Sequence, residues 1–339
     1  MSGMESADLH PVSRPIRALG LLSGGLDSQL ALCVIRDQGV KVEAVFFESP
    51  FCDAGRARQA AAALGVYLHV VDFTPDILEL LRDPPHGFGS CLNPCVDCHA
   101  RMLKRTGGLM EDLGYHFVFT GEVLNQRPMS QRRETLGVVA RDSGFADRVV
   151  RPLSAGHLKP TLPEREGWLD RSRLLSLEGR SRKPQMALAL AYKLKSYPTP
   201  AGGCRLTEPN FCRRLDDLRR HGGITGTRSV ELLKAGRHFR LNDGQKIVVG
   251  RNAADNETLE RSADLYDALI TPTGVTGATV LVPLPAEDAD LLRAAAIGAH
   301  YSHAAPGQVV DMQVRTAAGV RTVGVLAAER REVEALMIV

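Results

Sequence analysis

The sequence contains no stretch near the roughly 18 consecutive apolar residues that cross a membrane, so we expect no membrane contact. Residues 1–14 also lack the apolar segment of a signal peptide. We therefore expect residues 1–15 to form a disordered tail and the protein to be cytoplasmic. No internal repeat or low-complexity tract is present. The composition, 44% apolar and 24% charged, is that of a globular protein, and 339 residues suit two domains.

Charge is nearly balanced, with a formal net charge of +3, and this value alone indicates no partner. The basic residues nevertheless concentrate in two stretches, Arg151 to Lys195 and Arg213 to Arg251. Such stretches could follow a phosphate backbone. A solvated surface is the simpler interpretation for either stretch alone.

Short apolar runs alternate with helical patterns over residues 16–155. Strands alternating with helices predict a doubly wound α/β domain with a parallel sheet. The expected strands are 17–22, 42–47, 66–73, 115–120 and 149–153, and the expected helices are 27–37, 54–64 and 98–113.

The composition and the apolar pattern of the sequence change twice after this domain. Residues 156–222 are polar, Pro-rich and basic, and we expect a connector that lies on a surface. Residues 223–339 predict a smaller α+β domain. Its expected strands are 230–233, 245–249, 278–282 and 309–314, and its expected helices are 256–269 and 288–299.

A strand running into Ser-Gly-Gly-Leu-Asp-Ser at residues 23–28, followed by a helix, predicts an anion-binding loop. Gly24 and Gly25 lack a Cβ, so the backbone can approach phosphate oxygens. The hydroxyls of Ser23 and Ser28 can donate to phosphate, whereas Asp27 suits Mg²⁺ binding or helix capping. The loop lacks the lysine of a Walker A motif, and it is not G-x-G-x-x-G. An ordinary glycine-rich turn is the simpler alternative.

Seven cysteines are present, and Cys91, Cys95 and Cys98 fall within eight residues. In a reducing cytoplasm we expect no disulfide framework. The Cys95-x-x-Cys98 pair can hold one metal ion or one cluster iron, but two ligands do not close a site. Cys204, after two glycines, is the best candidate for a third ligand.

Other interpretations of these cysteines remain open. The spacing of Cys91, Cys95 and Cys98 is that of a radical SAM motif, although Asp97 stands where that motif usually has an aromatic residue. A Zn²⁺ site that adds His99 is also chemically possible. We expect Cys33, Cys52 and Cys212 to be buried as small apolar residues.

Residues 23–28 match the signature of the PP-loop ATP pyrophosphatases, and the sequence resembles that family. The resemblance implies that ATP is cleaved between its α and β phosphates and that a substrate oxygen is adenylated, with Mg²⁺ as cofactor. Asp27 is then a catalytic residue. The implied nucleotide-binding residues are Leu21, Ser23, Gly24, Gly25, Leu26, Asp27, Ser28, Phe47 and Gly121.

Cys95, Cys98 and Cys204 resemble the three-cysteine set of cluster-dependent tRNA thiolation enzymes. The resemblance implies a [4Fe-4S] cluster on these thiolates, in preference to Zn²⁺. A mechanism without a cluster, similar to that of the tRNA 2-thiouridylases, would place a persulfide on Cys98 and use Cys204 to resolve it. Either route makes Cys98 and Cys204 catalytic residues, and thiolate pKa would control it.

Further segments resemble a branch related to tRNA 4-thiouridine synthase and the 2-thiouridylases. They are residues 120–131, 151–154, 179–185 and 200–204. No THUMP-like domain precedes the loop, which leaves the target base open. In this branch Gly121 should lie beside the nucleotide, and Glu122 could bind Mg²⁺, orient the uridine or form a salt bridge. The residues expected to hold tRNA phosphates are Ser130, Gln131, Arg180, Arg182 and Lys183.

Residues 232–240 and 249–252 resemble the RNA-binding domain of NFACT-type proteins, and Arg237 and Arg251 are the expected RNA contacts. A domain for dimerisation or packing is the alternative. The combined prediction is an ATP-dependent tRNA sulfurtransferase that converts a uridine to thiouridine. Its partners would be tRNA and a sulfur donor, namely a cysteine desulfurase, a sulfur carrier or sulfide, with a homodimer as one arrangement. A PP-loop amidotransferase or small-molecule ligase and a non-catalytic, nucleotide-regulated RNA-binding protein are the alternatives.

Overall fold

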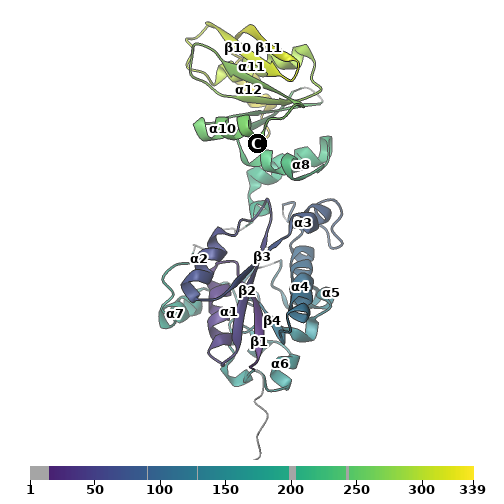
Figure 1. Ribbon diagram of the computed structural model, residues 1–339, viewed down its shortest axis with the longest axis vertical. Coiled ribbons are helices and arrows are strands. Elements are labelled where there is room, and N and C mark those ends of the chain that lie inside the picture. The colour runs from purple at the N-terminus through teal and green to yellow at the C-terminus, as the bar shows by residue number, and fades with distance from the viewer. Residues whose placement is uncertain (1–14, 90, 128, 198–203, 242–243) are drawn as a thin grey trace, which may run out of the picture. The chain divides into compact units, whose positions relative to one another are not determined.

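The computed structural model describes residues 15–89, 91–127, 129–197, 204–241 and 244–339. The expected tail lies, up to residue 14, outside these ranges. The chain divides into two compact units, shown in Figure 1. Unit 1 comprises Met1–Gly89 and Pro94–Gly203, and unit 2 comprises Ser90–Asn93 and Cys204–Val339. Among the described helices, none combines the length and the apolar character that a membrane span requires.

Unit 1 is built on a parallel sheet of five strands in the order β3-β2-β1-β4-β5. This order belongs to the doubly wound α/β class, so the predicted fold class is confirmed. In such sheets ligands bind at the carboxyl ends of the strands. The strands are β1 (Arg17–Leu21), β2 (Lys41–Glu48), β3 (Leu68–Asp72), β4 (Phe117–Phe119) and β5 (Val149–Val150).

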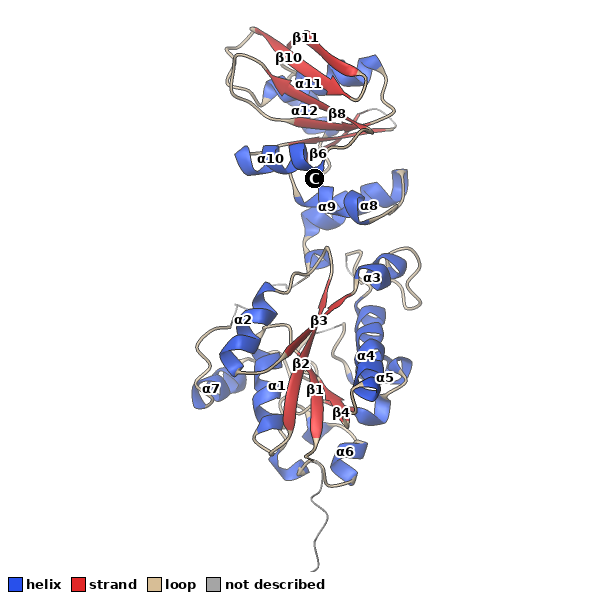
Figure 2. Ribbon diagram, viewed as in Figure 1, coloured by secondary structure: helices blue, strands red, loops and turns tan. Residues whose placement is uncertain are grey.

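Helices cover both faces of this sheet. Figure 2 shows α1, α2 and α7 on one side of the strands and α4 and α5 on the other. The helices are α1 (Leu26–Arg36), α2 (Gly55–Leu64), α3 (Thr74–Leu80), α4 (Cys95–Asp112), α5 (Arg133–Ser143), α6 (Leu162–Arg165) and α7 (Lys183–Ala191).

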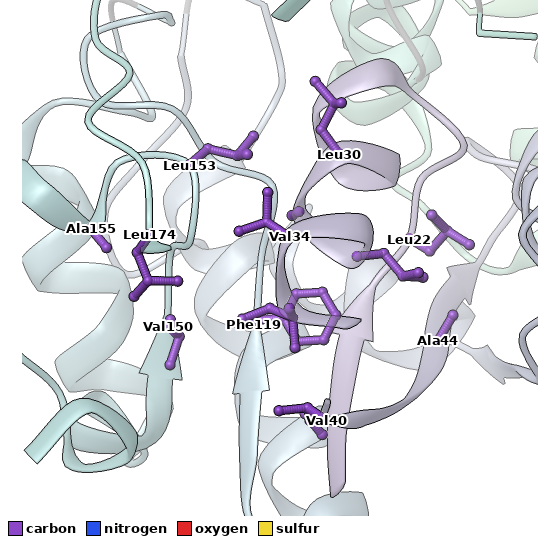
Figure 3. Close-up of a cluster of buried hydrophobic side chains, with 14 of the residues drawn as sticks. Leu22, Leu30, Val34, Val40, Ala44, Phe119, Val150, Leu153, Ala155 and Leu174 are labelled. Atoms are coloured by element: carbon purple, nitrogen blue, oxygen red, sulfur yellow. The ribbon is translucent and has the colours of Figure 1, made fainter. Parts of the chain in front are cut away.

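The core of unit 1 lies between α1 and the sheet. Leu22, Val34 and Val40 lie around the ring of Phe119 and belong with it to one buried cluster (Figure 3). Leu174, from the segment expected to be a surface connector, belongs to the same cluster. The described residues 156–197 of that segment therefore belong to unit 1, and the part from Cys204 onward belongs to unit 2.

Unit 2 contains an antiparallel sheet of six strands in the order β11-β10-β8-β9-β7-β6. The predicted smaller α+β domain is confirmed. Its strands are β6 (Arg237–Leu241), β7 (Gln245–Val249), β8 (Asp267–Pro272), β9 (Val280–Pro283), β10 (Val309–Thr316) and β11 (Gly319–Leu326). Its helices are α8 (Pro209–His221), α9 (Thr227–Glu231), α10 (Ala253–Ser262), α11 (Asp288–His300) and α12 (Arg330–Leu336).

Two element predictions in this unit are wrong. Residues 230–233 form the end of α9 and a 3-10 turn, Leu232–Lys234, rather than a strand. The helix expected over 256–269 ends at Ser262, and β8 begins at Asp267. Both errors arise from short apolar runs, in which the periods of helix and strand cannot be separated.

Candidate functional site

The loop at residues 23–28 joins the carboxyl end of β1 to the amino end of α1. Gly24 has φ +77°, and a Cβ there would lie 2.6 Å from the carbonyl carbon and oxygen of Arg56. Gly25 is the N-cap of α1, and no side chain caps the helix. The N–H groups of the first turn therefore lack a side-chain acceptor, which suits them to bind an anion such as phosphate.

Gly121, expected beside the nucleotide, follows Thr120 at the end of β4 and packs directly on the start of α1. A Cβ at Gly121 would lie 2.5 Å from the backbone nitrogen of Ser28 and 2.6 Å from the carbonyl carbon of Asp27. Only glycine fits here without displacing backbone. Gly121 thus touches the loop residues that would meet the phosphates.

The two serine hydroxyls of the loop lie together. Ser23 Oγ and Ser28 Oγ are 3.3 Å apart, and Ser28 Oγ donates to the carbonyl oxygen of Gly25 at 2.9 Å. Gln29, one residue further along α1, donates from Nε2 to the carbonyl oxygens of Gly24 at 2.9 Å and Ser196 at 3.1 Å. These bonds hold the loop in the shape of an anion cradle.

Asp27 is held from outside the loop by two glutamines. Gln126 donates from Nε2 to Asp27 Oδ2 at 2.8 Å, and Gln185 donates from Nε2 to Gln126 Oε1 at 3.0 Å. Asn125, at φ +60°, makes the turn that precedes Gln126. Neither glutamine was among the expected site residues. Both lie in segments that resemble the thiolation branch, but no pattern in the sequence pairs them with Asp27.

Several buried polar atoms around Asp27 have no hydrogen-bond partner among the described residues. They are Asp27 Oδ1, Gln185 Oε1 and Arg182 Nε. Burial raises the pKa of Asp27, while the bond from Gln126 and the charge of Arg182 lower it. Orphaned polar atoms are costly inside a protein, so these three atoms suit contact with a polar ligand. A carboxylate oxygen is the ligand type that Mg²⁺ prefers, and Asp27 fits that ion.

The remaining expected nucleotide residues are apolar. Leu21 ends β1, and Leu26 begins α1 and is buried. Phe47 in β2 is also buried, and its ring packs edge-on against Phe73 at 5.4 Å between centroids.

Cys95 and Cys98 lie one turn apart at the start of α4, and Cys98 N–H bonds the carbonyl oxygen of Pro94 at 2.8 Å. Burial raises the pKa of the Cys95 thiol, and the nearby charge of Arg127 lowers it. Asp97 accepts hydrogen bonds from the backbone nitrogen (3.1 Å) and Nδ1 (2.7 Å) of His86. Through these bonds, Asp97 connects the loop at His86 to the helical turn that carries Cys95 and Cys98.

Glu122 is buried behind this turn. Its carboxylate accepts from Arg151 Nε at 2.8 Å and from Thr120 Oγ1 at 3.0 Å, and it lies 3.3 Å from His99 Nδ1. Burial opposes ionisation, but the charges of Arg151 and His99 prevail, and the pKa of Glu122 falls to about 2. Of the interpretations open for Glu122, the structure shows the salt bridge.

The three expected cluster ligands fall in different units, Cys95 and Cys98 in unit 1 and Cys204 in unit 2. In the described ranges, no three His, Cys, Asp or Glu side chains gather closely enough to form a metal site. None of the seven cysteines is in a disulfide. The three-cysteine set therefore stays a sequence prediction.

The residues expected to bind RNA differ in exposure. In unit 1, Arg180 and Lys183 are exposed and Arg182 is half-buried, whereas Ser130 and Gln131 are buried. In unit 2 both expected arginines have partners. Arg237 stacks over the ring of Tyr301 at 4.3 Å, and Arg251 Nε pairs with Asp255 Oδ2 at 2.6 Å.

The sheet order, the glycine loop and its uncapped helix are those of an α/β domain of the PP-loop type. Residues 15–157 match the model of the family described as thiamine biosynthesis protein (ThiI). Residues 236–337 match the model described as NFACT protein RNA binding domain. Residues 15–157 are thus similar to the ThiI family and residues 236–337 to the NFACT RNA-binding domain, so both predicted resemblances are confirmed.

Curated relatives carry the name probable tRNA sulfurtransferase. One from Caldanaerobacter subterraneus subsp. tengcongensis is 33% identical over 159 residues, which is 44% of this chain and 40% of the relative. One from Thermoanaerobacter sp. is 32% identical over 152 residues, 42% of this chain and 38% of the relative. The chain thus spans about two fifths of the length of these relatives.

Among solved structures, one described as a 4-thiouridine synthetase–RNA complex with bound ATP is similar to this chain. The sequence identity is 25% and the TM-score 0.34, over 40% of this chain and 36% of that one.

Proposed function

We propose that this protein is an ATP-dependent tRNA sulfurtransferase, which adenylates a uridine carbonyl oxygen and replaces that oxygen with sulfur. The observation that carries the proposal is the ThiI match over residues 15–157, which contains the whole anion-binding loop. The relatives named for tRNA sulfur transfer support the same activity.

ATP would bind with its phosphates on residues 23–28. The first-turn N–H groups of α1 and the hydroxyls of Ser23 and Ser28 would donate to phosphate oxygens. Asp27 would hold Mg²⁺ through Oδ1, and this ion, when bound, would neutralise charge on the pyrophosphate. The hydrogen bond from Gln126 to Asp27 Oδ2 would keep Asp27 Oδ1 oriented toward the ion.

Two displacements then complete the reaction. The uridine carbonyl oxygen attacks the α phosphorus, and pyrophosphate leaves with the electron pair of the broken P–O bond. A sulfur nucleophile attacks the carbon that bears the AMP group, and AMP leaves. The uridine must leave its base stack to reach the loop.

The sulfur would be handled by Cys95, Cys98 and Cys204. These three thiolates would hold a [4Fe-4S] cluster, which when bound would supply the sulfur nucleophile. The alternative is a persulfide on Cys98 that Cys204 resolves. The sulfur donor would be a desulfurase, a sulfur carrier or sulfide.

Transfer RNA would be held mainly through its phosphates. Exposed Arg180 and Lys183 suit phosphate contact, and unit 2 carries a domain of RNA-binding type. Because tRNA is the substrate, we place the reaction in the cytoplasm. A homodimer is compatible with this scheme and stays a prediction.

The test is tRNA-dependent formation of AMP and pyrophosphate by the purified full chain. Asp27→Asn should lower the rate at least about a hundredfold, because it removes the charge that holds the metal. Asp112→Asn, at the exposed end of α4, is the matched control and should keep the rate. Rapid AMP formation without tRNA, driven by a small acid instead, would identify a small-molecule ligase and contradict the proposal.

A further inference from the structure

Three of the seven cysteines belong to unit 2, and none of them was expected to lie beside another. Cys204 begins the main part of the unit, and Cys212 lies in α8. Cys91 reaches the unit through the short segment Ser90–Asn93, whose flanking residues belong to unit 1. This segment ends immediately before the turn that carries Cys95 and Cys98.

The thiol of Cys212 is in hydrogen-bond contact with the thiol of Cys91, and the backbone N–H of Leu92 also bonds Cys212. Cys212 Sγ lies 3.1 Å from the carbonyl oxygen of Leu206, and its side chain is buried. Cys91 is only half-buried. The half-buried thiol of Cys91 therefore contacts the buried thiol of Cys212, although 121 positions separate the two residues in the sequence.

We propose that Cys91 and Cys212 form a redox-active dithiol that closes to a disulfide on reaction with a low-molecular-weight disulfide. The half-buried Cys91, as the thiolate, attacks one sulfur of the reagent, giving a mixed disulfide and releasing one thiolate. Cys212 then loses its proton to that thiolate and attacks Cys91 Sγ. The second reagent thiolate leaves, so two cysteine thiols are oxidised while one reagent disulfide is reduced.

The surroundings of the pair favour this order of attack. Burial, with the contact to Cys91, raises the pKa of the Cys212 thiol to about 12. Cys212 is thus a poor first nucleophile, and Cys91 is the thiol that a reagent can reach. Cys204 lies close enough to Cys212 for their charges to interact.

Closure would attach the segment before Cys95 covalently to α8. A disulfide restricts the chain most when the residues it joins are far apart in sequence. Oxidation would therefore fix the segment that leads into the proposed sulfur-handling turn. The inference concerns the thiols alone and stands apart from the proposed tRNA chemistry.

The test is peptide mapping without reduction. The reduced full chain is treated with oxidised glutathione in the absence of oxygen, alkylated and cut with trypsin. Trypsin places Cys91 in residues 83–101, Cys204 in 196–205 and Cys212 in 206–213, so the products separate. We expect a disulfide-linked product of peptides 83–101 and 206–213.

Peptide 83–101 also contains Cys95 and Cys98, so variants are needed to show which of its cysteines forms the disulfide. Cys91→Ser should abolish the linked product, and Cys204→Ser should retain it. The proposal is overturned if peptide 83–101 links to 196–205 instead, if the product persists in Cys91→Ser, or if only glutathione adducts form. Because the first measurement uses the unaltered chain, a variant that fails to fold does not decide the outcome.

Discussion

Gln126 donates a hydrogen bond to the carboxylate of Asp27 across a sequence separation of 99 residues. Asp27 Oδ2 is occupied by this bond, while Asp27 Oδ1 is buried with no partner among the described residues. One oxygen is thus fixed by the protein and the other is left for a ligand. The bond therefore connects the segment after β4 to the chemistry of the loop.

Gln126→Leu should weaken the reaction without unfolding unit 1. Loss of the amide leaves Asp27 Oδ2 unsatisfied, at a cost of about 1–3 kcal/mol, which corresponds to roughly a tenfold to hundredfold loss in kcat/KM. The Mg²⁺ concentration for half-maximal rate should rise as well. The matched control is Gln313→Leu in β10, which should change neither value. An unchanged Mg²⁺ dependence in Gln126→Leu would contradict the proposal that Gln126 positions the Asp27 carboxylate for Mg²⁺.

Gly121→Ala should abolish ATP binding, as measured by calorimetry. The new methyl group would lie 2.5 Å from Ser28 N, and backbone atoms on both sides would have to move. Gly137→Ala is the matched control, because a Cβ there meets nothing within 4 Å. Since Gly137 lies inside α5, that change should stabilise the fold by up to about 1 kcal/mol. Normal ATP affinity in Gly121→Ala would contradict contact between Gly121 and the loop.

Acid should destabilise unit 1 through Glu122. Its pKa falls from 4.5 in the unfolded chain to about 2 in the fold, so its contribution is present above pH 4.5 and is lost as pH falls toward 2. The shift corresponds to about 3 kcal/mol, to order of magnitude. Urea unfolding from pH 6 to pH 3 should show a steeper loss of stability for the native chain than for Glu122→Gln. Parallel curves would show that Glu122 does not drive the acid sensitivity.

Arg180→Ala and Lys183→Ala should each weaken tRNA binding uniformly across tRNA sequences. Loss of one phosphate contact should reduce the slope of log affinity against log salt by about one. Lys41→Ala supplies the control. Lys41 is exposed at the start of β2, at the amino ends of the parallel strands, whereas the loop lies at their carboxyl ends. Filter binding at several salt concentrations measures the slopes. Equal slopes for all the variants would exclude Arg180 and Lys183 from the RNA contact.

The sequence was sufficient to predict β1, the loop and α1, because the glycine pattern and the apolar run are local signals. It also predicted the cysteine turn at the start of α4. The bond from Gln126 to Asp27 could not be predicted, since it depends on how distant segments pack. The contact of Cys91 with Cys212 could not be predicted for the same reason. Cys212 was expected only to be buried as a small apolar residue. In unit 2, β8 was hidden in a predicted helix because its apolar residues, Ala268 to Ile270, form a short run in which the periods of helix and strand cannot be separated.

The most direct test of the account is mass spectrometry of nucleosides from tRNA incubated with the anaerobically purified chain, ATP, Mg²⁺ and sulfide. The account predicts a thiouridine that requires ATP and disappears in Cys98→Ser and in Cys204→Ser. Unmodified tRNA, from a chain that binds both ATP and tRNA under the same conditions, would contradict it.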